Sequence, residues 1–506
     1  MYLLGIGLTA IVRVPLIVAI GGSFAVLASD GRLETLVNEL DQFARNTDLG
    51  EGSMAGTPPD IPPGLETALA DAISLPVVGL LVGGAVAALV IGVVVNGLSS
   101  AATLHGMHAA LRGGDAVKAA VTGVGRDWSS FVGLSVVTAA LVVVGAIPAV
   151  VGLGLFAISP AAGGLATAVG VVLGGSVVVA GLLALTFAGA SVVADDAGLG
   201  DAIKQSIRVP FNRPGAFIGY VIVSLGVFGL LSAAGSLFSA LGVSQLSGIV
   251  GPLLLVPFLD IVKLAVYADR TVDEQPAGTE TGDSGQTGPT ARTSAIGSNA
   301  SGSRPQASAP SRVVAAFGDG VVALGGFVRG YPLAVAAATG VFTLAAVLGG
   351  VLTGSFGTEL PLPTEANEVF GSVPVDVFVM LAANNWLVSA TAAYGGIALG
   401  VPAATDMLLN GLIVGALYGV VDQTGFLALV APHGVIELPA IFIAGGLGFH
   451  IAAGVGGYLT GRCSAGLLAT RLRRAYRVLL GLAVMLILAA LIEAFLTPRV
   501  AAAVLG

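Results

Sequence analysis

Long apolar stretches, each about as long as a lipid bilayer is thick, recur along this 506-residue chain between short polar segments. A bilayer core of roughly 30 Å requires about 20 apolar residues of helix. Eleven stretches reach or approach that length, at 14–28, 76–98, 131–156, 161–190, 215–240, 247–267, 332–354, 376–400, 405–421, 437–460 and 478–497. The pattern predicts an all-α, polytopic membrane protein with about eleven transmembrane helices.

Composition excludes a soluble domain, because 55% of the residues are hydrophobic and only 10% are charged. A soluble fold could not hide that much apolar surface in its own core. The single cysteine, Cys463, excludes an internal disulfide and a cysteine-rich metal site. Lysine is scarce beside arginine and the net charge is −8, which resembles proteins of salt-loving archaea.

The chain divides at residues 271–311, a stretch with almost no large apolar side chains. Such a segment cannot bury enough surface to offset chain entropy, so we expect a disordered cytoplasmic linker. It separates a six-span membrane module, residues 1–270, from a five-span module, residues 312–506, and the two are expected to form two helical bundles. We expect the short first span, 14–28, to remain uncleaved; a cleaved signal peptide is the alternative.

The positions of the Lys and Arg residues predict the orientation of the chain in the membrane. With the N-terminus inside, all but three of the 21 Lys and Arg residues fall in inner loops or at inner membrane ends. The two longest outer loops, 29–75 and 355–376, are acidic and read as solvated surface. We therefore expect a multi-pass protein of the cell membrane with a cytoplasmic N-terminus and an external C-terminus. The arginine-rich segment 462–477 is expected to enforce this topology and to touch anionic lipid, with partner docking as the alternative.

In the first module, segment 191–208 begins with acidic residues and ends with basic ones, which complements a helix dipole. It predicts a short amphipathic helix along the inner surface, before Pro214 starts the next span. The arrangement over about 76–270 resembles archaeal multispan families of unknown function and, remotely, the membrane domain of some glycerophosphodiester phosphodiesterases. His105 and His108 have the spacing to share a metal, but no third ligand accompanies them, so we expect interfacial hydrogen bonding.

The second module places polar residues and glycines in a distinctive order. An asparagine pair lies inside one span, a Pro-His-Gly-x-x-Glu-x-x-Ala element opens a later one, and a glutamate closes the last. In order and spacing these elements, over about 320–500, resemble the stage II sporulation protein M family. The resemblance implies an integral membrane component of a complex that anchors cell-wall hydrolases during engulfment. Because most archaea lack both murein and spores, we expect the membrane module to carry over and the engulfment role not to.

Two interpretations compete for the polar set, which comprises Asn384, Asn385, His433, Glu437 and Glu493. In the first, these side chains hydrogen-bond between helices, and glycines at four-residue spacing (Gly396, Gly400, Gly411 and Gly415) let the helices approach closely. In the second, they bind a cation or a polar substrate in the outer half of the membrane. We expect the first. Whether a metal binds here stays open, as does a re-entrant path around Asp422.

No Walker-type loop, nucleophile elbow or His-Glu-x-x-His motif occurs, so we expect a protein that is not an enzyme and needs no cofactor. The function predicted is a membrane scaffold or complex subunit; a permease-like transport component is the alternative. The partners expected are the lipid bilayer and other membrane proteins, with a homo-oligomer as a further option, and no nucleic acid.

Overall fold

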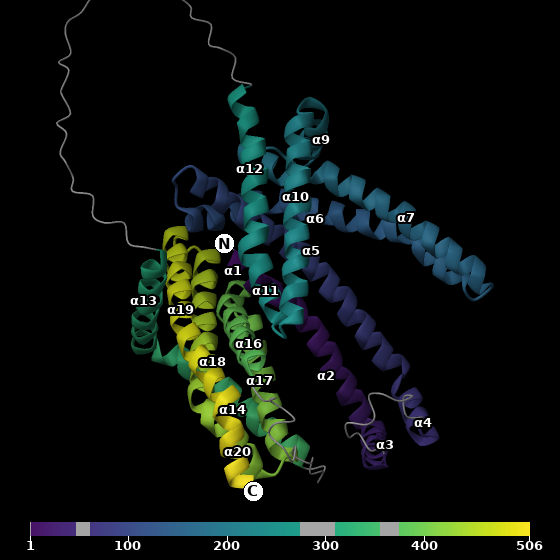
Figure 1. Ribbon diagram of the computed structural model, residues 1–506, viewed down its shortest axis with the longest axis vertical. Coiled ribbons are helices and arrows are strands. Elements are labelled where there is room, and N and C mark those ends of the chain that lie inside the picture. Colours follow the sequence, from purple (N-terminus) through teal and green to yellow (C-terminus); the bar gives the residue numbers. More distant parts are fainter. Residues whose placement is uncertain (1, 47–60, 274–308, 355–373, 506) are drawn as a thin grey trace, which may run out of the picture.

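The structure is a computed structural model that describes residues 2–46, 61–273, 309–354 and 374–505 (Figure 1). Across these residues it is helical and has no β-strand. The helices before residue 274 are α1 (Tyr2–Thr9), η1 (Ala10–Val12), α2 (Arg13–Ser29), α3 (Arg32–Asn46), α4 (Pro63–Ala72), α5 (Leu75–Leu111), α6 (Ala116–Leu155), α7 (Pro160–Leu185), α8 (Ala188–Asp195), α9 (Leu199–Asn212), α10 (Pro214–Ala240), η3 (Ser244–Leu246), α11 (Ser247–Val250), η4 (Gly251–Leu255) and α12 (Val256–Asp273). Those after residue 308 are α13 (Ala309–Gly330), α14 (Pro332–Gly354), α16 (Val375–Tyr394), η5 (Gly395–Ala398), α17 (Val401–Val420), α18 (Gln423–Leu459), α19 (Ala465–Phe495) and α20 (Thr497–Leu505).

Twelve helices among the described residues are long and apolar enough to cross a bilayer. The class, an all-α polytopic membrane protein, is confirmed. The eleven predicted stretches do not include the twelfth candidate, Pro310–Gly330, because Arg312, Asp319 and Arg329 dilute its apolar character. Apart from their ends, the predicted linker 271–311 and the acidic loop 355–376 lie outside the described residues.

Helix α19 is the centre of the C-terminal module. Its residues Leu479, Leu482 and Leu486 are fully buried, in one core with residues of α13, α16 and α18. Helix α13 lies antiparallel along α19: its Gly320 meets the backbone of Gly481, and its Gly326 accepts a hydrogen bond from Arg474 nearer the start of α19. In lipid, helices gain nothing by hiding apolar surface from each other, so such close backbone approach is what holds them together.

Helices α14 and α17 run parallel and touch through small residues. A Cβ atom on Gly411 would overlap the carbonyl of Phe342, and one on Gly415 would overlap the backbone of Ala346. Both partners lie 69 residues earlier, which fixes the parallel direction. Two of the glycines that the sequence predicts to pack helices therefore lie at this contact.

The predicted span 376–400 ends earlier, because the chain turns before residue 400. Helix α16 stops at Tyr394, and Leu399 and Gly400 adopt left-handed conformations with φ of 56° and 80°. Gly396 approaches the carbonyl of Gly448 on α18, and Gly400 precedes α17 as its cap. Glycine adopts this φ without steric cost, so position 400 requires glycine for its backbone conformation as well as for its small size.

The N-terminal module has a second core, formed by residues of α5, α6, α8, α9, α10 and α12. The predicted amphipathic helix 191–208 is split into α8 and α9 because Asp196, with φ of 51°, ends α8 in the left-handed conformation. Pro214 begins α10 as predicted. Tyr267 on α12 hydrogen-bonds Asp195 and also Gln205 on α9, the latter at 2.8 Å, so polar contacts tie these helices together.

The two modules are in direct contact. Leu4 of α1 belongs to the core of the C-terminal module, and a Cβ atom on Gly7 would overlap the backbone of Tyr394. At the start of α6, Asp115 accepts hydrogen bonds from Arg473 of α19 at 2.7 and 2.9 Å. Figure 1 shows α1 lying against the C-terminal bundle, while the chain ends at the opposite end of that bundle. The bundle that the sequence predicts after residue 311 is thus completed by the first residues of the chain.

Candidate functional site

Three ionisable side chains converge between α18 and α19. His433 Nε2 lies 3.9 Å from Glu437 Oε2 and 3.8 Å from Glu493 Oε1. One ligand atom from each residue lies within 4.8 Å of the other two. The side chains are only 13–20% exposed. The structure thus brings together three of the five residues that the sequence selects.

Helix α18 places two of them on one face, four residues apart, but it does so differently from the prediction. The sequence suggested that Pro432 occupies the first turn of a helix. Instead α18 begins at Gln423, where the Asp422 side chain accepts a hydrogen bond from Gly425 N at 2.7 Å, and it continues through Pro432 and Pro439. The Asp422 cap connects α17 directly to α18, and each proline removes one hydrogen bond of the helix at this site.

A residue that sequence reasoning did not select completes the group. Thr497, at the start of α20, is 1% exposed, and its Oγ1 lies 3.4 Å from His433 Nδ1. The same hydroxyl lies 3.3 Å from the carbonyl oxygen of Ile492 as a donor. The signal in the sequence was the threonine before Pro498, four residues after Glu493, which is typical of a helix start.

Glu493 is incompletely paired. Its Oε2 atom is shielded from solvent and has no hydrogen-bond partner among the described residues. A buried carboxylate oxygen without a partner is costly, because it has lost water and gained nothing in return. The group is therefore one of the places where the described fold leaves a buried carboxylate oxygen unpaired; Asp406 Oδ2 is another.

The asparagine pair does not join the group. Asn384 Nδ2 donates to Asn385 Oδ1 at 3.3 Å, and the neighbouring Trp386 hydrogen-bonds the carbonyl of Leu479 on α19. At helical rise, Leu479 lies about 20 Å along α19 from Glu493. The pair therefore lies deeper in the bundle than the group formed by His433 and the two glutamates.

The arginines at the start of α19 contact protein in this structure, although the sequence suggested contacts with lipid. Arg473 pairs with Asp115, Arg471 donates to the carbonyl of His450 at 3.2 Å, and Arg474 lies over the ring of Tyr331 at 5.1 Å. These contacts join α19 to α6, α18 and the segment between α13 and α14.

In the first module, His105 is paired with a carboxylate. His105 Nε2 lies 2.8 Å from Asp127 Oδ2, which also accepts a hydrogen bond from Arg126. Arg126 also reaches Asp196, at 2.9 Å. The group is a polar contact between α5, α6 and the turn after α8, as expected from the single pair of histidines.

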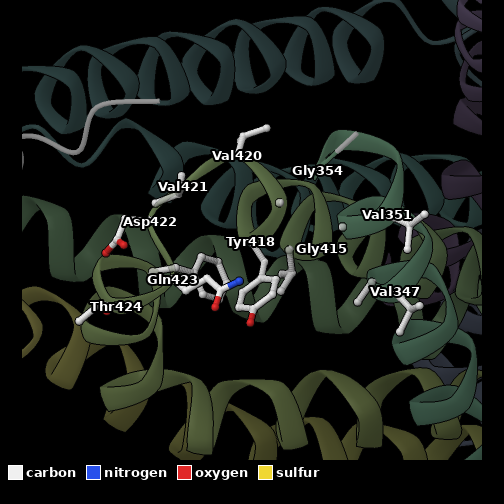
Figure 2. A pocket seen from close by; sticks show the side chains of 15 residues that line it. Val347, Val351, Gly354, Gly415, Tyr418, Val420, Val421, Asp422, Gln423 and Thr424 are labelled. Atoms are coloured by element: carbon white, nitrogen blue, oxygen red, sulfur yellow. The ribbon is translucent and has the colours of Figure 1, made fainter. Parts of the chain in front are cut away.

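A separate open pocket of about 830 Å³ lies near the ends of α14 and α17 and the start of α18. Its lining combines apolar side chains, such as Val347 and Val351, with the polar segment Asp422–Thr424 (Figure 2). Tyr418 projects into the same space in Figure 2. None of the three converging ionisable residues lines this pocket.

The fold and the comparisons agree on the class, an integral, multi-pass membrane protein. Residues 332–498 match the model of a family, stage II sporulation protein M, and the match contains all three converging residues. The predicted resemblance of the C-terminal half is therefore confirmed, while that of the N-terminal half stays a prediction. An uncharacterized protein of Methanocaldococcus jannaschii is 29% identical over 129 residues, which are 24% of this chain and 72% of that protein. No solved structure matches the chain.

Proposed function

We propose that the protein is a non-enzymatic scaffold, or complex subunit, of the stage II sporulation protein M type. It would lie in the cell membrane with its N-terminus in the cytoplasm and its C-terminus outside, and would hold other membrane proteins. Termini on opposite sides require an odd number of crossings, so in this arrangement eleven of the twelve candidate helices span the bilayer. The observation that carries the proposal is the junction between the two modules.

The junction resists relative motion at two points. Gly7 is seated on the backbone of Tyr394, so α1 cannot slide along α16 without a clash. Arg473 Nη1 donates to both carboxylate oxygens of Asp115, which adds an ion pair between α19 and the start of α6. Carriers built from two bundles work by rocking one against the other around a central site. A junction that holds the two modules in a fixed relative position therefore suits a scaffold better than a carrier.

The family resemblance supports the same function. It implies a membrane component that anchors other proteins, and only residues 332–498 match that family. The first module is then an addition that is locked onto the matched module through α1 and Arg473.

One observation favours the alternative of a permease-like component. The open pocket beside α14 and α17 has a polar lining at Asp422–Thr424, directly where one span ends and the next begins. Interrupted spans with polar linings are where carriers bind solutes. In this alternative the pocket is one end of a path, and the junction must move during transport.

Cross-linking the junction separates the two functions. Cysteines introduced at Asp115 and Arg473, with Cys463 replaced by serine, can be joined by a short bis-maleimide in native membranes. A scaffold should co-purify with the same membrane proteins before and after cross-linking, as identified by mass spectrometry. The variant with a cysteine at Asp115 alone is the matched control. Loss of the co-purifying set only in the cross-linked double variant, or recovery of no partner by any variant, would contradict the scaffold.

The junction also predicts how fragments behave. Residues 312–506 expressed alone lack α1, which leaves the backbone of Tyr394 uncovered. We expect this fragment to aggregate in detergent and to be rescued by co-expression of residues 1–270, measured by size-exclusion chromatography. A monodisperse fragment would mean that the modules are independent and that the junction is weak.

A further inference from the structure

We infer that His433, Glu437 and Glu493 bind one divalent transition-metal cation of the Zn²⁺ or Mn²⁺ class, which clamps α18 to α19. The inference does not depend on the scaffold proposal, because it rests on the geometry of this group alone.

The spacing within the group is the first reason. Separations of 3.8 and 3.9 Å from His433 Nε2 to the two carboxylates are too long for hydrogen bonds. A metal ion bonded at about 2.0–2.2 Å to nitrogen and oxygen holds two of its ligands about 3–4 Å apart. The three side chains therefore face one another across a space that fits an ion better than it fits direct contact.

The histidine is oriented to act as a ligand. Thr497 Oγ1 donates to the Ile492 carbonyl, so its lone pairs are available to the Nδ1–H of His433. With the proton on Nδ1, the tautomer that lets His433 donate to this oxygen, the lone pair of Nε2 is directed at the two glutamates. A lone pair facing two carboxylates is unfavourable by itself, whereas a cation placed between them is attracted to all three. Metal-binding histidines commonly have their other ring nitrogen held in this way.

The charge balance within the group is the third reason. Glu437 and Glu493 approach the same point, their side chains are 17% and 20% exposed, and the buried Oε2 of Glu493 has no hydrogen-bond partner among the described residues. Ionised groups held away from water in a membrane protein need a partner of opposite charge. In the part of the chain that the structure describes, no lysine or arginine contacts either carboxylate, so a bound cation would supply the positive charge.

The ligand types narrow the choice of ion. One imidazole nitrogen with two carboxylates suits Zn²⁺, Mn²⁺ or Fe²⁺, whereas Ca²⁺ and Mg²⁺ prefer all-oxygen sets and Cu⁺ prefers sulfur. Three protein ligands leave a position for water. Because two ligands lie on α18 and the third on α19, the bound ion would cross-link the two longest helices of the module.

The test uses the full chain with Cys463 replaced by serine, which removes the single thiol as an adventitious ligand. After treatment with EDTA, the protein in detergent is titrated with Zn²⁺ and with Mn²⁺, and both the bound metal and the thermal midpoint are measured. We expect saturation at a single ion per chain and a rise in the midpoint as the site fills.

Glu437→Gln and Glu493→Gln should each weaken binding about tenfold or more, because they keep the shape and remove the charge that the ion needs. Asp406→Asn, which changes a half-buried carboxylate on α17, is the matched control and should bind as the parent does. Should the variants fail to fold, the Co²⁺ spectrum of the parent protein still decides. Visible bands from nitrogen and oxygen ligands support the site, and a spectrum identical to aqueous Co²⁺ overturns it.

Two results would refute the inference. One is the absence of saturable binding by the parent protein at metal concentrations up to about 100 μM, where an ordinary protein site would fill. The other is unchanged binding in the double variant Glu437→Gln/Glu493→Gln. In either case the group holds a proton or water instead of a metal.

Discussion

Replacing Gly415 by alanine tests whether close backbone approach holds α14 and α17 together. The added Cβ would overlap the carbonyl oxygen, carbonyl carbon and Cα of Ala346. These are backbone atoms, so no rotamer change relieves the overlap and the helices have to separate. Overpacking of this kind costs about 1–3 kcal/mol. Alanine also favours a helix over glycine by about 0.5–1 kcal/mol, which partly offsets the penalty.

A control variant separates the two effects. Gly340 lies on α14, is exposed, and has nothing within 4 Å of an added Cβ. Gly340→Ala therefore reports the helix preference without the overlap, and the difference between the two variants isolates the helix contact. We expect Gly415→Ala to unfold at a temperature several degrees below Gly340→Ala, measured by differential scanning fluorimetry in one detergent. Adding Ala346→Gly should not restore stability, because the clash is with backbone. Equal midpoints for Gly415→Ala and Gly340→Ala, or full rescue by Ala346→Gly, would refute the reasoning.

The remaining predictions concern the junction and the topology. The backbone N–H of Lys118 and the guanidinium of Arg473 lower the pKa of Asp115, so its stabilising contribution is present above the ordinary carboxyl range and is lost as pH falls through the lowered value. Asp115→Asn, which keeps a capping side chain, should make thermal stability less sensitive to acid; an unchanged pH profile would count against the contact. For topology, single cysteines at Thr67 and Arg499 should react with an impermeant maleimide from the same side of the membrane. A cysteine at Arg112 should react only from the other side, and equal labelling of Arg112 and Arg499 from outside would overturn the proposed orientation.

The sequence alone determined the class of the protein. Runs of about 20 apolar residues leave a chain no alternative to spanning a bilayer as helices, since an unpaired backbone is costly in lipid. The same local reasoning selected Gly411 and Gly415, because small residues at helical spacing form a stripe on one face whatever helix meets it. It also placed His433 and Glu437 together, since residues four apart share a helix face.

Only the tertiary structure decided which helices meet. Sequence spacing could bring Glu493 near Glu437 only as one of several arrangements. It also grouped Asn384 and Asn385 with them, whereas in the structure the two asparagines pair with each other, because depth along two different helices depends on their register. The continuation of α18 through Pro432 was equally hidden, since local preference treats proline as a helix start while packing tolerates it inside. The seating of α1 against Tyr394 joins residues nearly 400 positions apart in the chain. Local chemistry specifies the helices, whereas long-range contacts, which local preferences do not encode, specify the site they form.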